Sequence, residues 1–344
     1  MNKYRARINA KGIVTAFGIG CSNLWDGLIN KKSAIKDIKG IDLYPGLPAV
    51  GAQIKDEIFN MQSFLELGQN DKNSMLFLIG LAIQDLLKTG NLDISFIKDE
   101  RISIFSSMLK GNIIGVEKFY SKKAEALATG KTFFLSHPAS ILAGILGSGN
   151  TVRTVSNACA SGTIALALAA DEIYHKKSCK TLIVAADLFA FSVQTGFASL
   201  GALSHKACKP FDINRNGLTL GEGSAAIVLE REETGNGPFI LGWGISNDAN
   251  HITAPSKTGE GLRRAIQNSL SMADMSVEKI GAIVAHGTGT KYNDSMEALA
   301  FKSVFPKAVP PICGIKGAIG HTSPATGLIE AAVAVDILKN NFIP

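Results

Sequence analysis

The sequence has no apolar run approaching the ~20 residues that a membrane-spanning helix needs. Its N-terminus, MNKYRARINAKGIVTAFGIG, carries polar residues and glycines where a signal peptide would have a continuous apolar core. We therefore expect no membrane insertion and a cytoplasmic location.

Aromatic residues are scarce, at 7%, and the lysines and arginines do not gather into runs. Nucleic-acid-binding proteins usually combine basic clusters with aromatic side chains, so we expect no nucleic-acid partner. Basic residues nevertheless outnumber acidic ones by 35 to 29, which gives a net charge of +6. This excess favours an acidic partner.

Cysteine is also sparse, and the spacing of the cysteines does not indicate a metal site. The five cysteines are an odd number, none lies in a CxxC pair, and they are spread along the chain at Cys21, Cys159, Cys179, Cys208 and Cys313. Such spacing predicts free thiols in a reducing compartment rather than disulfides or a zinc site.

Short β-branched runs alternate with longer helical patterns along the 344 residues, of which 46% are hydrophobic. This alternation predicts a layered α/β protein with strands buried on both faces. The first series has strands at 6–16, 101–109, 151–158, 181–189 and 224–230 and helices at 22–33, 70–91, 137–150 and from 161 onward. The second has strands at 238–247, 280–290 and 311–316 and helices at 259–274, 294–305 and 327–341. The two series resemble two copies of one plan.

Cys159 lies between a strand and an alanine-rich helix, in the stretch VSNACASGTIALALAADEIYHKK. A helix N-terminus carries unpaired N–H groups and a partial positive charge, which stabilise a thiolate and lower the pKa of the thiol. Small neighbours at 158, 160 and 162 leave room for a substrate. The alternative is a structural cysteine that acts as a small buried hydrophobe.

Two histidines are candidate partners for this thiol. His286 and His321 each follow an apolar strand, in glycine- and threonine-rich loops. The carboxyl ends of strands are where α/β proteins collect catalytic groups. Either histidine alone could instead satisfy a loop carbonyl. A metal site is a further alternative, but it would need another close ligand, and the sequence shows none.

Five segments carry a resemblance to a known family: SNACASGT, KPFDINRNGLTLGEGSAAIVLE, SNDANHITAPSKTGEG, HGTGTKYNDSMEALA and IKGAIGHTSPATG. In collinear order they resemble the signatures of elongating β-ketoacyl-acyl carrier protein synthases, the condensing enzymes of fatty acid and polyketide synthesis. The resemblance implies the thiolase fold, with two duplicated α/β halves and five-stranded sheets in α-β-α-β-α layers. The halves would be 1–235, with the cysteine, and 236–344, with the histidine loops. It also implies a dimer, homomeric or with a related synthase subunit, formed near the cysteine segment.

The resemblance also implies roles for individual residues. Cys159 would take the acyl group, and neutral His286 and His321 would stabilise the enolate formed when a malonyl thioester loses CO₂. The other implied site residues are Lys316, which would support the histidine loop through Glu297, the supporting Asp294, and Thr288 and Thr290 along the phosphopantetheine arm. The acyl carrier protein partner brings that arm, so we expect no resident cofactor and no metal. The two threonine hydroxyls could equally stabilise their own loop.

Two departures qualify the resemblance. GHTSPATG places Ser323 and Pro324 where small residues are usual, which resembles specialised polyene branches of the family. Family members also continue past NNFIP into further strands and a Gly-Phe-Gly-Gly loop, so we expect the C-terminal half to be incomplete. Two alternatives stay open: a non-catalytic partner like the chain-length factors, which lack the nucleophile, and a thiolase or initiating synthase, the latter with asparagine where His321 stands.

Overall fold

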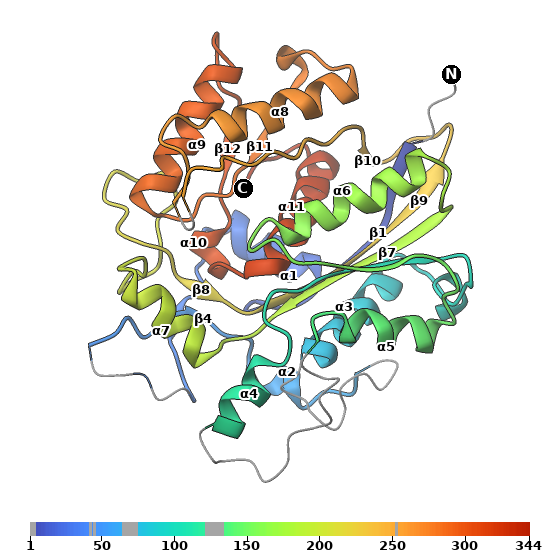
Figure 1. Ribbon diagram of the computed structural model, residues 1–344, viewed down its shortest axis with the longest axis horizontal. Coiled ribbons are helices and arrows are strands. Elements are labelled where there is room, and N and C mark those ends of the chain that lie inside the picture. The colour runs from blue at the N-terminus through green and yellow to red at the C-terminus, as the bar shows by residue number, and fades with distance from the viewer. Residues whose placement is uncertain (1–4, 41–42, 44–45, 64–74, 121–133, 252–253) are drawn as a thin grey trace.

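The computed structural model describes residues 5–40, 43, 46–63, 75–120, 134–251 and 254–344 (Figure 1). Its main sheet has the strand order β10-β1-β9-β7-β5-β6, with β2 paired to β1. Strands β5, β6 and β7 run parallel, whereas β9 is antiparallel to both β7 and β1. The bounds are β1 Arg5–Thr15, β2 Gly18–Ile19, β5 Ser103–Ser107, β6 Val152–Val155, β7 Lys180–Asp187, β9 Gly223–Glu232 and β10 Phe239–Ile240.

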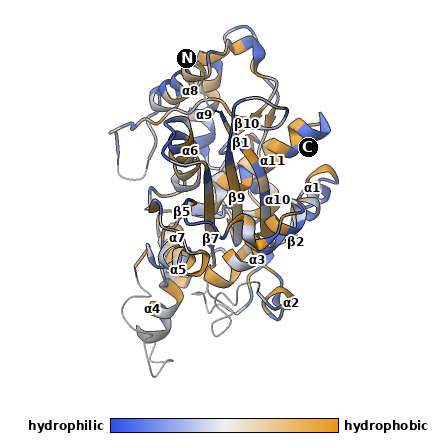
Figure 2. Cartoon of the chain, turned by 90° about the vertical axis from the view of Figure 1, so that its right-hand side faces the viewer, coloured by the Kyte–Doolittle hydropathy of each residue, from blue (hydrophilic) through white to orange (hydrophobic). Residues whose placement is uncertain are grey.

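Helices cover both faces of this sheet, which explains why the central strands β5, β7 and β9 are buried along most of their length. On one face lie α3 (Met75–Thr89) and α5 (His137–Leu146). Figure 2 shows the hydrophobic residues of α3, nearly all of which are buried. The other face is covered by α1 (Cys21–Ile29), α6 (Ser161–Tyr174) and α11 (Thr326–Asn340).

A second, smaller sheet lies beyond α6 and α11 and is covered by two more helices (Figure 1). It consists of β11 (Ile283–Val284) and β12 (Ile312–Cys313), which pair in parallel. The covering helices are α8 (Glu260–Ala273) and α9 (Lys291–Val304). The layers therefore run α-β-α-β-α, as expected for this fold class.

The second sheet differs from the predicted five strands, because within the described ranges it has two. The predicted strand at 238–247 pairs only at Phe239–Ile240, and there it joins β1 of the main sheet. The predicted strands at 280–290 and 311–316 likewise pair over two residues each before they give way to loops. The loop after β11 carries His286. The expected position of His321 directly after a strand is wrong, because α10 (Lys316–Ile319) separates His321 from β12.

Several elements were not predicted. They are β2, β3 (Lys36–Asp37), β4 (Val50–Ala52), α2 (Asp56–Phe59), α4 (Ile113–Tyr120), α7 (Phe191–Ser199), β8 (Leu220–Gly221) and α10 (Lys316–Ile319). All but α4 and α7 are four residues or shorter, too short for a periodic pattern to be visible. The predicted start of the 70–91 helix, with Asn70 and Asp71, lies outside the described residues.

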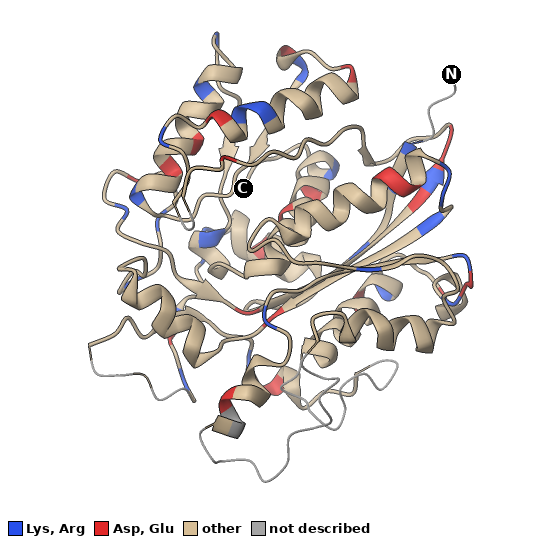
Figure 3. Ribbon diagram, viewed as in Figure 1, with Lys and Arg blue, Asp and Glu red and all other residues tan. Residues whose placement is uncertain are grey.

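The distribution of charged residues and the state of the cysteines agree with what the sequence predicts. In Figure 3, lysines and arginines are spread over many elements and interspersed with acidic residues. All five cysteines are free. No helix in the described part of the chain is long and apolar enough to cross a membrane.

Candidate active site

Cys159 lies in a tight turn between β6 and α6. Ala158, just before it, adopts a left-handed φ of 47°. The Ser161 hydroxyl closes the turn by accepting the Asn157 N–H at 2.6 Å and donating to the Ala158 carbonyl at 2.6 Å. The turn keeps Cys159 half-buried in front of α6, as predicted from the sequence.

The predicted fall in the pKa of the Cys159 thiol is wrong. Burial raises this pKa above its ordinary value, against a smaller lowering effect of the Lys316 charge. The N-terminus of α6 is also less available to the Cys159 sulfur than expected, because the N–H groups of Ala160 and Ser161 donate to carbonyls of the turn. The thiol is therefore protonated at rest, and a thiolate must be stabilised by groups that face the sulfur.

The His286 loop is held by two carboxylates from α9. Glu297 accepts the N–H groups of His286 and Gly287, at 2.9 and 2.7 Å. Asp294 accepts the N–H of Gly289 at 3.2 Å and that of Phe211 at 2.7 Å. Both predicted supporting residues thus act on the loop backbone.

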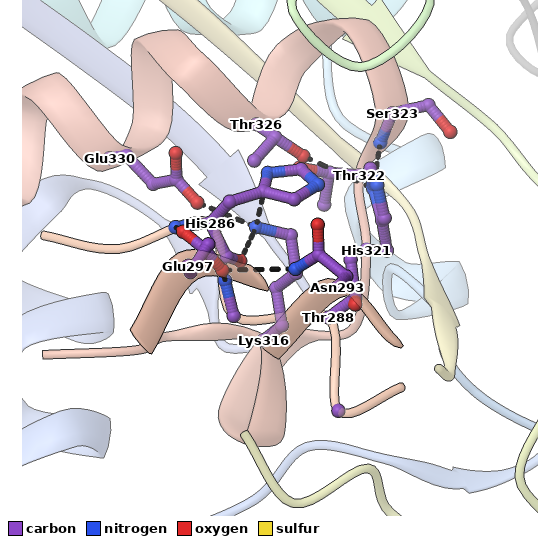
Figure 4. A network of polar contacts seen from close by, with 12 residues as sticks. His286, Thr288, Asn293, Glu297, Lys316, His321, Thr322, Ser323, Thr326 and Glu330 are labelled. Carbon is purple, nitrogen blue, oxygen red and sulfur yellow. Dashed lines mark hydrogen bonds and ion pairs between the residues drawn. The ribbon is translucent and has the colours of Figure 1, made fainter. Parts of the chain in front are cut away.

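Lys316 reaches the same loop from α10, although its carboxylate partner is not the predicted one. Its ammonium lies 2.6 Å from Glu330 on α11, not against Glu297 (Figure 4). The Lys316 side chain is 1% exposed, and it also donates to the carbonyl and to Nδ1 of His286. Burial raises the pKa of Glu330, which the Lys316 charge opposes. The sequence reading missed Glu330 entirely, although a lone acidic residue within the apolar stretch 327–335 was its signal.

His321 is held by its own following turn. The backbone N–H of Ser323 donates to Nδ1 of His321 at 2.9 Å, and the Thr326 hydroxyl lies 3.3 Å from the same nitrogen (Figure 4). The chain approaches α6 closely here, since a Cβ at Gly162 would lie 2.7 Å from the Pro324 carbonyl oxygen. Glycine at this position lets the histidine turn pack on the start of the cysteine helix.

These elements bring the thiol and both imidazoles together. The sulfur of Cys159 and one ring nitrogen of each of His286 and His321 all lie within 4.8 Å of one another. The two rings are 5.2 Å apart between centroids and nearly perpendicular, at 82°. The three candidate catalytic residues, which come from three separate loops, therefore form one site.

The protonation of both rings is set by their neighbours. An ammonium and a backbone N–H can only donate, so Nδ1 of each ring must accept, and each neutral ring carries its proton on Nε2. Burial and the Lys316 charge hold the pKa of both histidines well below 6.5. The site therefore offers two neutral N–H donors, which suits a developing oxyanion. The same tautomer opposes metal binding, which needs an unprotonated nitrogen facing the ion.

The two threonines use their hydroxyls within the loop. Thr288 and Thr290 lie 2.9 Å apart between hydroxyl oxygens, and Thr288 donates to Asp294 at 3.3 Å. These contacts stabilise the loop. Contact of either hydroxyl with a phosphopantetheine arm stays a prediction.

Comparison with known proteins identifies the family of the chain. Residues 7–235 match the beta-ketoacyl synthase N-terminal domain and residues 239–344 the beta-ketoacyl synthase C-terminal domain. The chain is 27% identical to 3-oxoacyl-acyl-carrier-protein synthase 2 of Coxiella burnetii, over 100% of this chain and 88% of that protein. It is 28% identical to the ketoacyl synthase alpha subunit of the tetracenomycin polyketide synthase of Streptomyces glaucescens, over 99% and 86%.

Solved structures include a similar one from the same group of enzymes. It is a ketosynthase of Xenorhabdus doucetiae in complex with its chain length factor, with a TM-score of 0.84, 26% identity, and coverage of 98% of this chain and 85% of that one. The family models match nearly the whole chain, one on each side of the expected division at residue 235. The chain belongs to the β-ketoacyl synthase family of condensing enzymes.

Proposed function

We propose that this protein is a β-ketoacyl-acyl carrier protein synthase that uses Cys159 as its nucleophile. The Cys159 sulfur attacks the thioester carbonyl of an acyl carrier substrate, and the bond to the carrier sulfur breaks. The proton of the Cys159 thiol passes to the departing carrier sulfur, and the acyl group becomes a thioester of the enzyme. The observation that carries this proposal is the convergence of one thiol and two imidazoles within 4.8 Å.

The histidines act in the second half-reaction. A malonyl thioester loses CO₂, and the electron pair of the broken C–C bond forms an enolate. The Nε2–H groups of His286 and His321 donate to the enolate oxygen, and their neutral state at pH 7 makes them donors without a proton transfer. The enolate carbon then attacks the acyl carbonyl and expels the Cys159 thiolate, which gives the β-ketoacyl product.

The reaction needs no resident cofactor, because the carrier brings its own phosphopantetheine arm. The exposed residues Lys206 and Lys209 are suited to an acidic carrier, since their loop lies close to the His286 loop. The N–H of Phe211 donates to Asp294, and a Cβ at Gly287 would lie 3.1 Å from Pro210. Thr288 and Thr290 lie in the His286 loop, where an arm directed at Cys159 would pass.

A dimer fits the β6 edge of the main sheet, where no further strand pairs within the described part of the chain. Strand β6 is the last strand of the sheet, directly precedes the Cys159 turn, and has exposed side chains at Val152 and Arg153. An unpaired edge is a template for pairing with a second chain. Either a copy of this chain or a related subunit fits there, as the Xenorhabdus ketosynthase pairs with a chain length factor.

The other candidate functions are less well supported. A non-catalytic partner subunit like the chain-length factors needs no nucleophile, whereas Cys159 here faces both histidines. An initiating synthase is expected to have asparagine in place of His321. We infer a cytoplasmic location and a role in fatty acid, polyene or polyketide synthesis.

The test is product formation. The protein, alone and with a candidate partner subunit, is incubated with an acyl carrier substrate and ¹³C-labelled malonyl carrier, and the carrier products are analysed by mass spectrometry. A β-ketoacyl carrier two carbons longer supports the proposal. Labelled acetyl carrier as the only product would point to decarboxylation without condensation. If no reaction occurs either with or without the partner subunit, the proposed function is contradicted.

A further inference from the structure

Strand β8 and the residue before it hold the backbone of His321. The His321 N–H donates to the Thr219 carbonyl at 2.7 Å, and the Gly221 N–H donates to the His321 carbonyl at 3.0 Å. The two segments lie so close that a Cβ at Gly221 would overlap the carbonyl oxygen of Ile319. The position of β8 therefore decides where the backbone of this histidine lies.

The side chain of Thr219 is bound to a different part of the chain, residues 206–209, which we call the lysine loop. The Thr219 hydroxyl accepts the Cys208 N–H at 3.0 Å and donates to the Lys206 carbonyl at 3.0 Å. Thr219 is 1% exposed, so water does not compete for these contacts. One residue thus joins the lysine loop, through its hydroxyl, to the backbone of His321, through its carbonyl.

Cys208 makes a second contact between the lysine loop and the site. This residue is buried, and its thiol donates to the Lys316 carbonyl at 3.1 Å. A thiol is a weak donor, so this contact holds the loop less firmly than the Thr219 hydroxyl does. The side chains of Lys206 and Lys209 are exposed, in contrast. The lysine loop therefore combines charges that face solvent with buried contacts to the segments that carry His321 and Lys316.

We propose that Thr219 is a positioning residue that fixes the lysine loop, and a carrier bound to it, relative to His321. This inference rests on the proposed function, in which Lys206 and Lys209 meet the acyl carrier. The phosphopantetheine arm has a limited length, so the place where the carrier docks decides where the malonyl group lies in front of His321. A displacement of about 1 Å can lower a rate by about 10²-fold. Small pantetheine thioesters do not dock on the lysine loop, so their position does not depend on it.

The first variant is Thr219→Val, which keeps the branched shape of the side chain but removes the hydroxyl that holds the lysine loop. We expect kcat for decarboxylation of malonyl carrier to fall about 10-fold, because the carrier is held less precisely. The KM for the carrier should change by less than about twofold, because both lysine charges remain. With malonyl pantetheine, kcat should also change by less than about twofold. Thr219→Ser keeps the hydroxyl and should restore the rate with malonyl carrier.

The matched control is Thr15→Val, on β1. Thr15 is also 1% exposed, and its hydroxyl accepts the Phe17 N–H at 3.3 Å. No hydrogen bond described for the Thr15 side chain reaches the lysine loop or His321. We expect this variant to decarboxylate malonyl carrier and malonyl pantetheine in the same ratio as the unaltered protein.

A second variant, Cys208→Ala, removes the weaker contact and serves if Thr219→Val does not fold, as monitored by circular dichroism. The Lys316 carbonyl that loses the thiol keeps the Gly320 N–H at 2.9 Å, so no buried acceptor is left unpaired. We expect the same selective loss of kcat with malonyl carrier, of about threefold, because the thiol is the weaker donor.

Hydrogen exchange tests the contact independently of activity. The backbone N–H groups of residues 206–209 should exchange faster in Thr219→Val than in the unaltered protein, in Thr219→Ser and in Thr15→Val. Unchanged exchange in this segment, or an equal loss of kcat with malonyl carrier and malonyl pantetheine, would overturn the inference. If the unaltered protein decarboxylates neither substrate, the proposed function fails instead, and hydrogen exchange still decides whether Thr219 holds the lysine loop.

Discussion

Replacing Glu330 with glutamine tests how the buried charge of Lys316 is stabilised. The carboxylate of Glu330 lies 2.6 Å from the ammonium of Lys316, a side chain that is 1% exposed. Glutamine keeps the shape and one acceptor oxygen but removes the counter-charge. Lys316 would then donate to the amide oxygen of the new glutamine, and it would keep its two contacts to His286, at the carbonyl oxygen and at Nδ1.

Two effects follow, and they differ in size. Breaking a buried ion pair by removing one partner costs about 3–5 kcal/mol, and we expect about 3 kcal/mol for Glu330→Gln because the amide oxygen still accepts a hydrogen bond. A loosened Lys316 would also no longer fix the Nε2–H tautomer of His286. Losing one such donor lowers the rate by about 10²- to 10³-fold, so malonyl decarboxylation should fall toward the lower figure.

The matched control lies on the same helix. Asp336→Asn breaks the Lys11–Asp336 pair, which also has a 2.6 Å separation but side chains 13% and 14% exposed. We expect this variant to lose stability in urea unfolding without a selective loss of decarboxylation. The account of Lys316 is refuted if folded Glu330→Gln decarboxylates malonyl substrates as fast as the Asp336→Asn control.

Three further predictions concern the histidines and the carrier. Replacement of His321 by alanine should leave Cys159 acylation, measured by intact mass, largely intact while it lowers malonyl decarboxylation by about 10²- to 10³-fold; equal loss of both would contradict the division of roles. Because burial and Lys316 hold the pKa of both histidines well below 6.5, decarboxylation should persist as pH falls through 6.5, and a pH profile centred at 6.5 would be evidence against neutral donors. Stability should fall over the same range, since the unfolded chain binds protons near pH 6.5 that the folded protein does not bind. Lys206→Glu with Lys209→Glu should raise the KM for carrier substrates and weaken its dependence on NaCl, with little effect on small pantetheine thioesters; an unchanged KM would argue against docking at this loop.

The three reactive groups of the site could be identified from the sequence, and the reason is physical. Cys159 and His286 follow the short strands β6 and β11, and chain order places such residues at strand ends. His321 was expected in the same position, but it follows the short helix α10 that comes after β12. The alternation of strands and helices predicted a layered α/β protein, and the order of the layers was implied by the family resemblance. Family resemblance supplied the roles, which composition and spacing alone left open.

The partners of these groups could not be read in the same way. Glu297 and Glu330 are both acidic residues on helices near the site, and the sequence does not say which of them meets Lys316. That choice depends on how α9 and α11 pack around α10. The pKa of Cys159 was mispredicted for a related reason, since the sequence shows a helix terminus but not the burial that opposes it.

The acyl-enzyme is the intermediate on which the whole account depends, and its mass is the most direct measurement. Unaltered protein, Cys159→Ala and Cys179→Ala, whose altered thiol is exposed, are each incubated with an acyl carrier substrate and analysed by intact mass and peptide mapping. The account predicts one acyl group on Cys159 in the unaltered protein and in Cys179→Ala, its discharge on addition of malonyl carrier, and no mass gain in Cys159→Ala. Acylation of Cys159→Ala at Cys208 or Cys313, to the extent seen in the unaltered protein, would contradict it.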